Sequence, residues 1–317
     1  MAKLLGKGSF GCFYEGNPLG IKKETKLVKL MTQKDNWQEE IENLSKIKKI
    51  KGNSIVNEDF LKNNVDNLTD VEKNIIYKLC DLSKSEINEA NEIYEIIYNQ
   101  MTKGITIGNA IKKNKITLKK LFKLSCELYA TLINYSKNRL LHNDIKYDNI
   151  IYIPNKNKLY FIDFGVLTSF DDKLVFSNYY SPPEKFLLKF KYDKSKFIIS
   201  FKKNFYELLN YQKNIINNYY DENDMNKDLE DLYLKYSFNK SLTDDDKTKI
   251  DTFMLSLTLF KLFIVKYEKY ENNKFIKLFL EKIIIPGIRF NNDKRLDIHA
   301  KDFIKLLKTF KMPNFYY

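Results

Sequence analysis

Residues 142–165 read HNDIKYDNIIYIPNKNKLYFIDFG, and this stretch decides the expected fold. Two apolar runs, residues 150–153 and 159–162, flank a polar turn at residues 154–157. Short runs of β-branched and aromatic residues on either side of a Pro-Asn turn are typical of a β-hairpin. The hairpin would bring the acidic loop that precedes it beside the acidic loop that follows it.

The polar residues at the two ends of this hairpin resemble the catalytic loop and the magnesium loop of protein kinases. The first loop contributes Asp144, Lys146 and Asn149, and the second begins with Asp163 in an Asp-Phe-Gly run. The resemblance implies that Asp144 accepts the substrate's hydroxyl proton and that Lys146 meets the transferring phosphoryl group. It also implies that Asn149 and Asp163 are the metal ligands that hold Mg²⁺ on ATP. Phosphoryl transfer needs oxygen ligands for a hard cation and fixed positive charge near the phosphate, and these residue types supply both.

A glycine-rich segment near the start of the chain resembles the kinase loop whose backbone N–H groups close over the phosphates of ATP. The cofactor-binding residues implied here are Gly6, Lys7, Gly8, Ser9, Phe10 and Gly11. Such glycines also occur in ordinary hairpins, but the Leu-Gly-Ile-Lys run at residues 19–22 strengthens the resemblance because it is similar to the family's Val-Ala-Ile-Lys strand. Period-2 alternation would point Gly20 toward adenine and Lys22 toward the phosphates. Lys23 is the alternative in a register shifted by one residue.

Lys22 should pair with a carboxylate on the next helix, and apolar residues at three-residue spacing predict that helix over residues 36–50. Glu40 precedes this apolar stripe as the family's ion-pair Glu precedes its own. Glu39 and Glu42 are the alternatives, and any single Glu of the three could instead be a solvated surface charge.

The strand that leads to the nucleotide-binding hinge is expected at residues 94–98. Residues 61–92, which precede it, are an insertion that is polar and expected to be helical. The resemblance implies that the hinge follows this strand and that Gln100 and Thr102 lie where backbone groups meet adenine.

Further motifs resemble kinase residues that have structural roles. A Pro-Pro-Glu run ends at Glu184 where kinases have Ala-Pro-Glu, and Arg295 resembles the Arg that pairs with this Glu. Asp251 resembles the buried Asp that anchors the backbone of the catalytic loop, and Ser177 matches the hydroxyl residue near the catalytic Asp of serine/threonine kinases. One position departs from the pattern, because Asn143 stands where many kinases have the Arg that clamps an activation-segment phosphate.

The stretch between residues 185 and 250 is an insertion, longer than the family needs. Helices are expected within it over residues 205–220 and 228–236. Its first part, residues 185–192, intersperses basic residues with aromatic ones. That pattern could contact an acidic substrate, nucleic acid or an anionic membrane, but core packing with lysines whose charged ends reach water is favoured.

Together these features predict an α+β chain with the bilobal protein-kinase-like fold. Residues 1–103 would form a small β-rich N-lobe, and residues 104–317 would form a larger, mainly helical C-lobe. Apolar residues at helical spacing over 118–133 and the apolar segment 253–265 would be core helices. The second of these is too short to span a bilayer, and no transmembrane segment is expected.

The chain has 317 residues and a formal net charge of +13, which favours an acidic partner without identifying one. Abundant Lys, Asn, Ile and Tyr are typical of an AT-rich genome, such as that of a large DNA virus, a protist or a low-GC bacterium, so the basic charge is not specific to binding. Cys12, Cys80 and Cys126 lack paired spacing, so we expect reduced thiols in a cytoplasmic compartment, or in a virion if the chain is viral. The two histidines leave no zinc cluster and no histidine-based triad.

The expected function is that of an ATP- and Mg²⁺-dependent serine/threonine protein kinase with a protein substrate. Lys146 and Ser177 favour a peptide hydroxyl as the acceptor. The first alternative is a small-molecule kinase of the choline or aminoglycoside type, because the His-Asn-Asp run also occurs there. The second alternative is a catalytically silent scaffold that uses the kinase fold for binding.

Overall fold

The computed structural model describes most of the chain, and the architecture below concerns only that part. The described residues are 3–8, 11–15, 27–54, 59–64, 68–71, 73–74, 92–98, 104–174, 180–190, 193–236, 241–267 and 273–311. The chain is mixed α+β and divides into two compact units. Unit 1 comprises Met1–Lys49 and Ser54–Gly104, and unit 2 comprises Ile50–Asn53 and Ile105–Tyr317.

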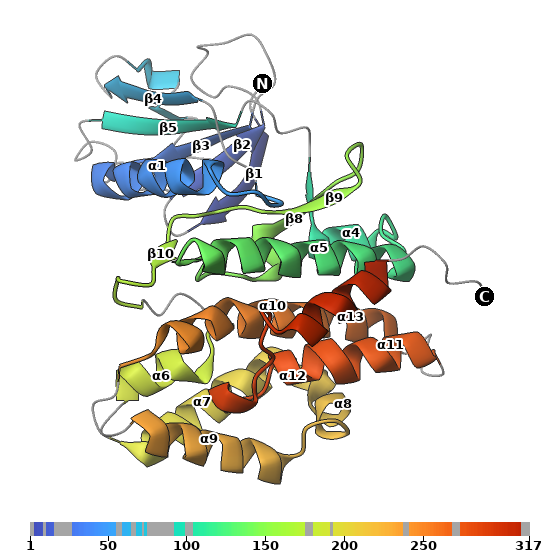
Figure 1. The fold of residues 1–317 in the computed structure, drawn as a ribbon. Helices are drawn as coiled ribbons and strands as arrows, with labels where there is room; N and C mark the ends of the chain where they lie inside the picture. The colour runs from blue at the N-terminus through green and yellow to red at the C-terminus, as the bar shows by residue number, and fades with distance from the viewer. Residues whose placement is uncertain are drawn as a thin grey trace. The chain divides into compact units, whose positions relative to one another are not determined.

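Unit 1 is a five-stranded antiparallel sheet with one long helix against it (Figure 1). The strands are β1 (Lys3–Gly8), β2 (Gly11–Glu15), β3 (Leu27–Met31), β4 (Asp59–Asn64) and β5 (Glu92–Tyr98), in the order β1-β2-β3-β5-β4. Helix α1 (Lys34–Lys48) contacts β3 and β5. It buries Leu44 and Ile47, which lie three residues apart on one face, and this is the apolar stripe that predicted the helix.

Three expectations for unit 1 can be compared with these strands. The strand expected at residues 94–98 is confirmed, because these residues belong to β5. The helical insertion expected from residue 61 is wrong at its start, because residues 61–64 belong to β4 and pair with β5. The strand expected at residues 19–22 lies outside the described residues.

Unit 2 is built around two long helices, α5 (Leu118–Lys137) and α10 (Asp244–Tyr267), which contact each other. The consecutive residues Phe253, Met254 and Leu255 are all fully buried, so α10 is covered on several sides. A helix that is apolar all round belongs to a core, and the expectation of a core helix over residues 253–265 is confirmed. The described elements that follow α10 are α11 (Lys274–Phe279), the π-helical η4 (Leu280–Ile284), α12 (Ile285–Gly287), η5 (Asn292–Lys294) and α13 (Lys301–Lys311).

Small sheets in unit 2 frame the acidic loops. Strands β8 (Ile150–Ile153) and β9 (Lys158–Phe161) pair as an antiparallel hairpin, which confirms the hairpin expected from the sequence. Strand β6 (Ile105–Thr106) adds to β8, and β7 (Leu140–Leu141) pairs with β10 (Thr168–Ser169). Helix α4 (Ile107–Lys112) and the 3₁₀ turn η2 (Tyr147–Asn149) lie beside this hairpin.

The insertion after residue 184 is part of the core of unit 2. Its elements are α6 (Pro183–Phe190), α7 (Lys194–Leu209), η3 (Asn210–Gln212), α8 (Lys213–Asn217) and α9 (Glu222–Tyr236). The single helix expected over residues 205–220 is wrong, because Asn210 takes a left-handed φ of 51° that ends α7. Phe186 of α6 is buried against Phe201 of α7, which supports the core-packing interpretation of residues 185–192.

Two global expectations concern membranes and cysteines. Among the described helices, none has the length and apolar character needed to cross a membrane. Cys126 is buried and is not disulfide-bonded, as expected. Cys12 is disulfide-bonded, which corrects the expectation that every cysteine is reduced.

A close approach of two helices makes Gly287 sensitive to substitution. A Cβ atom at this position in α12 would lie 2.6 Å from the Ser256 Cβ of α10 and closer still to its hydroxyl, which bonds the Tyr129 hydroxyl. We expect Gly287→Ala to lower the free energy of unfolding by about 1–3 kcal/mol, measured by urea denaturation. Gly108→Ala is the control, because its Cβ would meet only a Tyr147 ring carbon at 3.6 Å. Equal stability of the two variants would contradict the predicted overpacking.

Candidate active site

Asp144 lies in the loop after β7, and its side chain is held from within the same loop. Its carboxylate Oδ2 accepts hydrogen bonds from Asn149 Nδ2 at 2.7 Å and from Lys146 Nζ at 3.0 Å. Asn149 Nδ2 also reaches the Asp144 backbone oxygen at 2.9 Å. Asp144 is only 8% exposed, so these contacts restrict its rotamer in a site largely screened from water. Three of the expected catalytic and metal-binding residues are therefore brought together.

The backbone of this loop is anchored by Asp251 of α10. The two carboxylate oxygens of Asp251 accept the backbone N–H groups of His142 at 2.6 Å and Asn143 at 2.9 Å. Burial raises the pKa of Asp251 above its ordinary value, while His142 and these two N–H groups oppose the rise. The expected role of Asp251 as the loop anchor is confirmed.

The two expected metal ligands emerge at the same end of the hairpin. Ile150 pairs with Phe161 across the strands, and the Ile162 N–H donates to the Asn149 carbonyl at 3.1 Å. Asp163 follows immediately with a left-handed φ of 63°, which turns the chain out of the strand. Asn149 and Asp163 thus leave adjacent positions of one small sheet, as the sequence predicts.

The chemistry of these residues fits a magnesium ion. The amide nitrogen of Asn149 is used by Asp144, and no described residue bonds its Oδ1, so the oxygen end is left to serve as a ligand. The described residues contain no cluster of three or more His, Cys, Asp or Glu suited to a metal. A site with one Asp and one Asn would take its remaining ligands from phosphate oxygens and water, which is how Mg²⁺ is commonly bound.

His142 has a packing role in this loop. Its ring lies 5.0 Å from the Phe164 ring and 5.4 Å from the Phe161 ring, measured between centroids. Its Nε2 is 3.1 Å from the carbonyl oxygen of Ile162. The side chain therefore links the two acidic loops through packing.

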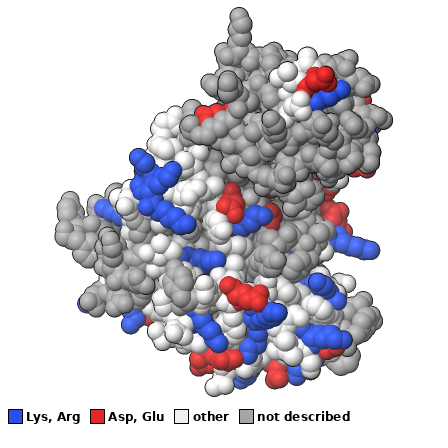
Figure 2. All heavy atoms as spheres, turned by 180° about the vertical axis from the view of Figure 1, so that it is seen from behind, with Lys and Arg blue, Asp and Glu red and all other residues white. Residues whose placement is uncertain are grey.

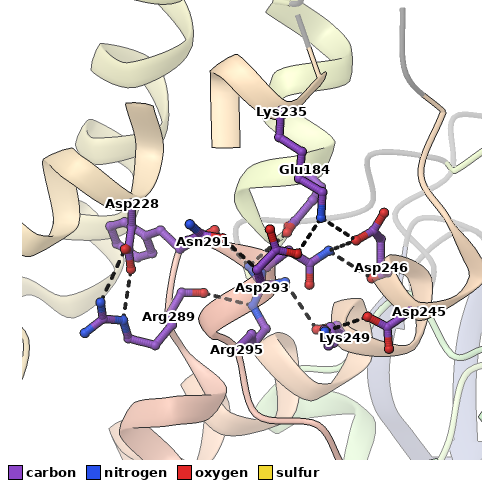
Figure 3. A network of polar contacts seen from close by, with 12 residues as sticks. Glu184, Asp228, Lys235, Asp245, Asp246, Lys249, Arg289, Asn291, Asp293 and Arg295 are labelled. Atoms are coloured by element: carbon purple, nitrogen blue, oxygen red, sulfur yellow. Dashed lines mark hydrogen bonds and ion pairs between the residues drawn. The ribbon is translucent and has the colours of Figure 1, made fainter. Parts of the chain in front are cut away.

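A buried ion pair fixes the start of α6, as expected. Arg295 Nη2 lies 3.0 Å from Glu184 Oε1, and both side chains are fully buried. Burial raises the pKa of Glu184, and the adjacent guanidinium opposes this. Arg295 also donates to the backbone oxygens of Arg289 and Phe290, which ties α6 to the segment after α12 (Figure 3).

The same network holds the insertion in place. Asp228 of α9 accepts a hydrogen bond from Arg289 at 2.9 Å (Figure 3). It also accepts one from Lys294 at 2.7 Å. Burial is the largest single influence on the pKa of Asp228, and it raises that pKa. The contacts with Lys294, Arg289 and the Tyr220 hydroxyl, the last at 2.6 Å, together outweigh burial, so the pKa of Asp228 is lowered. Lys235 of the same helix reaches Asp246 at 3.0 Å, at the start of α10. These ion pairs thus connect the insertion to α10, the helix whose Asp251 binds the backbone of the Asp144 loop.

In unit 1, the buried carboxylate has a different partner from the one expected. Glu40 Oε2 lies 2.6 Å from Lys29 Nζ, and both side chains are almost fully buried. Lys22 and its alternative Lys23 lie outside the described residues, as does Gly20. Lys29 is thus a partner of Glu40 that the sequence did not predict, and the expected pairing of Lys22 with Glu40 stays a prediction. Glu39 and Glu42, the alternatives to Glu40, are exposed on α1.

The glycine-rich segment is the β1–β2 hairpin. Gly6 and Lys7 are in β1, and Gly8 pairs with Gly11 across the turn. Gly11 has a φ of 153°, and a Cβ there would collide with the Leu30 carbonyl, so this position requires glycine. Ser9 and Phe10 lie outside the described residues, and so do the expected hinge residues Gln100 and Thr102 and the expected hydroxyl residue Ser177.

The sequence did not predict the burial of two lysines, Lys29 and Lys185. Lys29 stands inside the run Leu-Val-Lys-Leu-Met, and a charge inside an apolar strand was the available signal. Lys185 directly follows Glu184 and is 2% exposed, although the sequence suggested a lysine whose ammonium reaches water. Its only sequence signal was its place between Glu184 and the apolar Phe186.

A cavity of about 430 Å³ lies beside the loop of residues 142–149 within unit 2. Its lining comes from α4, from Tyr147 and Asp148, from the end of α7 with η3, and from α10. The Lys261 ammonium lies 6.0 Å from the ring centroid of Tyr147, and both residues line the cavity. Burial lowers the pKa of Lys261 and raises that of Asp148. The cavity therefore offers both signs of charge and an aromatic wall.

Comparison with known proteins assigns no relative to this chain. No family of known proteins matches the sequence, and no curated protein matches it. Any functional assignment therefore depends on the residues and geometry described above.

Proposed function

We propose that the chain is a serine/threonine protein kinase that transfers the γ-phosphoryl group of ATP to a protein hydroxyl. The observation that carries this proposal is the arrangement around Asp144. Its carboxylate is held by Lys146 and Asn149, its loop is anchored by Asp251, and Asp163 leaves the same end of the β8–β9 hairpin. A bilobal kinase-like fold, with unit 1 as N-lobe and unit 2 as C-lobe, is part of the proposal.

The chain's own residues supply a base and fixed positive charge for this reaction. Asp144 would accept the hydroxyl proton while the substrate oxygen forms a bond to the γ-phosphorus and the bond from phosphorus to the oxygen of ADP breaks. Lys146, already 3.0 Å from this carboxylate, would place an ammonium beside the transferring group. Mg²⁺, held by Asn149 and Asp163, would neutralise charge on the phosphate oxygens.

The residues of unit 1 have a different task in the proposal. The backbone of the β1–β2 hairpin, with glycine required at Gly11, would bind phosphates through N–H groups. Lys29, held by Glu40, would contribute the phosphate-binding ammonium. A lysine buried in a strand with one carboxylate partner is strongly restricted in position, which suits this role.

A protein substrate is supported by the cavity beside the catalytic loop. Its volume of about 430 Å³ accommodates a side chain next to the phosphorylated residue, and the insertion contributes part of its wall. On the face drawn in Figure 2, the described basic side chains are interspersed with acidic ones. The proposal accordingly keeps a protein substrate and gives nucleic acid and anionic membranes no role.

The test is transfer of labelled γ-phosphate from Mg-ATP by the purified chain, offered an acidic protein, a basic protein and choline. We expect label on protein Ser or Thr, with none on choline. Label on choline alone would replace the proposal with the small-molecule alternative. ATP binding without any transfer would favour the silent scaffold and overturn the enzymatic proposal.

A further inference from the structure

Lys185 occupies an unusual place for an ammonium group. It is 2% exposed, and it follows Glu184, whose buried pair with Arg295 fixes the start of α6. Its Nζ donates a hydrogen bond of 3.1 Å to the backbone oxygen of Asn143. Long charged side chains rarely bury their charged ends unless those ends have a specific task.

The carbonyl that Lys185 contacts belongs to the peptide that carries Asp144. The N–H of Asn143 is held by Asp251 at 2.9 Å, and its side-chain amide donates to the Thr168 hydroxyl at 2.9 Å. Asn143 has a left-handed φ of 66°, a conformation that persists in a non-glycine residue where its surroundings hold it. Lys185 supplies the contact on the carbonyl side, so Asn143 is fixed through its N–H, its side chain and its C=O.

We propose that Lys185 is a positioning residue that orients the Asn143–Asp144 peptide and thereby the catalytic carboxylate of Asp144. This inference rests on the proposed kinase function. Asn143 carries no charge, and the cation at this point of the loop is provided instead from α6. A charged donor makes a stronger hydrogen bond to a carbonyl than a neutral one does, so the ammonium holds the peptide better than the free amine.

The electrostatic surroundings make this contact sensitive to pH. Burial lowers the pKa of Lys185 to about 8, while Asp251 of α10 and Asp144 of the loop oppose the shift. The other elements packed on α6 are α7, whose buried residues are apolar, and α9, whose buried Asp228 is held by Arg289 and Lys294. The ammonium is present below about pH 8 and is lost as the pH rises through that value.

The first experiment compares Lys185→Met with Lys189→Met, the same substitution at an exposed position of α6. We expect Lys185→Met to lower kcat by about 10–100-fold with the KM for ATP little changed, because a misplaced catalytic group affects the chemical step. Lys189→Met should keep the wild-type kcat. Wild-type kcat should fall above pH 8, and this alkaline decline should be absent in Lys185→Met.

Lys185→Arg and hydrogen exchange complete the test. Arg keeps its charge at every accessible pH, so Lys185→Arg should retain activity at pH 9, where the wild type declines. Amide exchange in residues 142–149 should rise in Lys185→Met and not in Lys189→Met. An active wild type with an unchanged kcat and pH profile in Lys185→Met would overturn the inference and leave the kinase proposal standing. No transfer by the wild type, with faster exchange in Lys185→Met, would overturn the kinase proposal and keep the role of Lys185 in orienting the loop.

Discussion

Replacing Asp144 by Asn should lower kcat for phosphoryl transfer by about 10²-fold or more while the fold and ATP binding persist. The amide can still accept from Asn149 and Lys146 through its oxygen, so the contacts within the loop can re-form. What is lost is the negative oxygen that takes the hydroxyl proton. A hundredfold loss corresponds to about 2.7 kcal/mol in the activation free energy.

Asp302→Asn is the matched control for this variant, because Asp302 is an exposed residue of α13. Turnover, nucleotide affinity and thermal unfolding should be measured for both. Asp302→Asn should resemble the wild type in all three measurements, whereas Asp144→Asn should differ only in turnover. Wild-type turnover by Asp144→Asn would remove this residue from the mechanism.

The second large effect is expected at the Lys29–Glu40 pair of unit 1. Lys29→Met should lower the free energy of unfolding by about 3–5 kcal/mol, because it removes the cation paired with a fully buried carboxylate. The same variant should also lose most phosphoryl transfer, since the proposed phosphate-binding ammonium is gone. Urea denaturation and the labelled-phosphate assay measure the two effects separately.

A double variant separates stability from function at this site. Lys29→Met with Glu40→Leu replaces the ion pair by apolar side chains and should recover much of the lost stability. It should not recover transfer if Lys29 acts on the phosphates. Recovery of both would make the pair purely structural. Lys22→Met tests the lysine expected from the sequence, and loss of transfer in Lys22→Met with normal transfer in Lys29→Met would assign the phosphate-binding ammonium to Lys22.

The candidate site shows which features can be predicted from local sequence. The β8–β9 hairpin was predictable because its strands and turn are contiguous, and a short antiparallel pair forms by local closure. The loop anchor Asp251 and the Glu184–Arg295 pair were predictable through the resemblance, and their contacts are confirmed. In each of these cases the residues stand in motifs of recognisable type and order.

The ion-pair lysine shows where local sequence was insufficient. Residues 19–22 and residues 27–31 both read as short apolar runs that contain a lysine, so alternation does not choose between them. The choice depends on sheet register, in which Lys29 of β3 lies opposite Ile96 of β5, and on the helix that presents Glu40. Register is set by contacts between distant segments, which a local pattern does not specify.

The sequence by itself determined the order of the acidic loops, the hairpin between them and the core helices, because these follow from periodicity, turn chemistry and motif spacing. The tertiary structure alone decided that Glu40 pairs with Lys29, that α7 ends at Leu209, and that Lys185 is buried against Asn143. Burial of a lysine is a property of everything packed around it. Its partners come from elements far away in the chain, so only the packed fold can choose between a solvated and a buried ammonium.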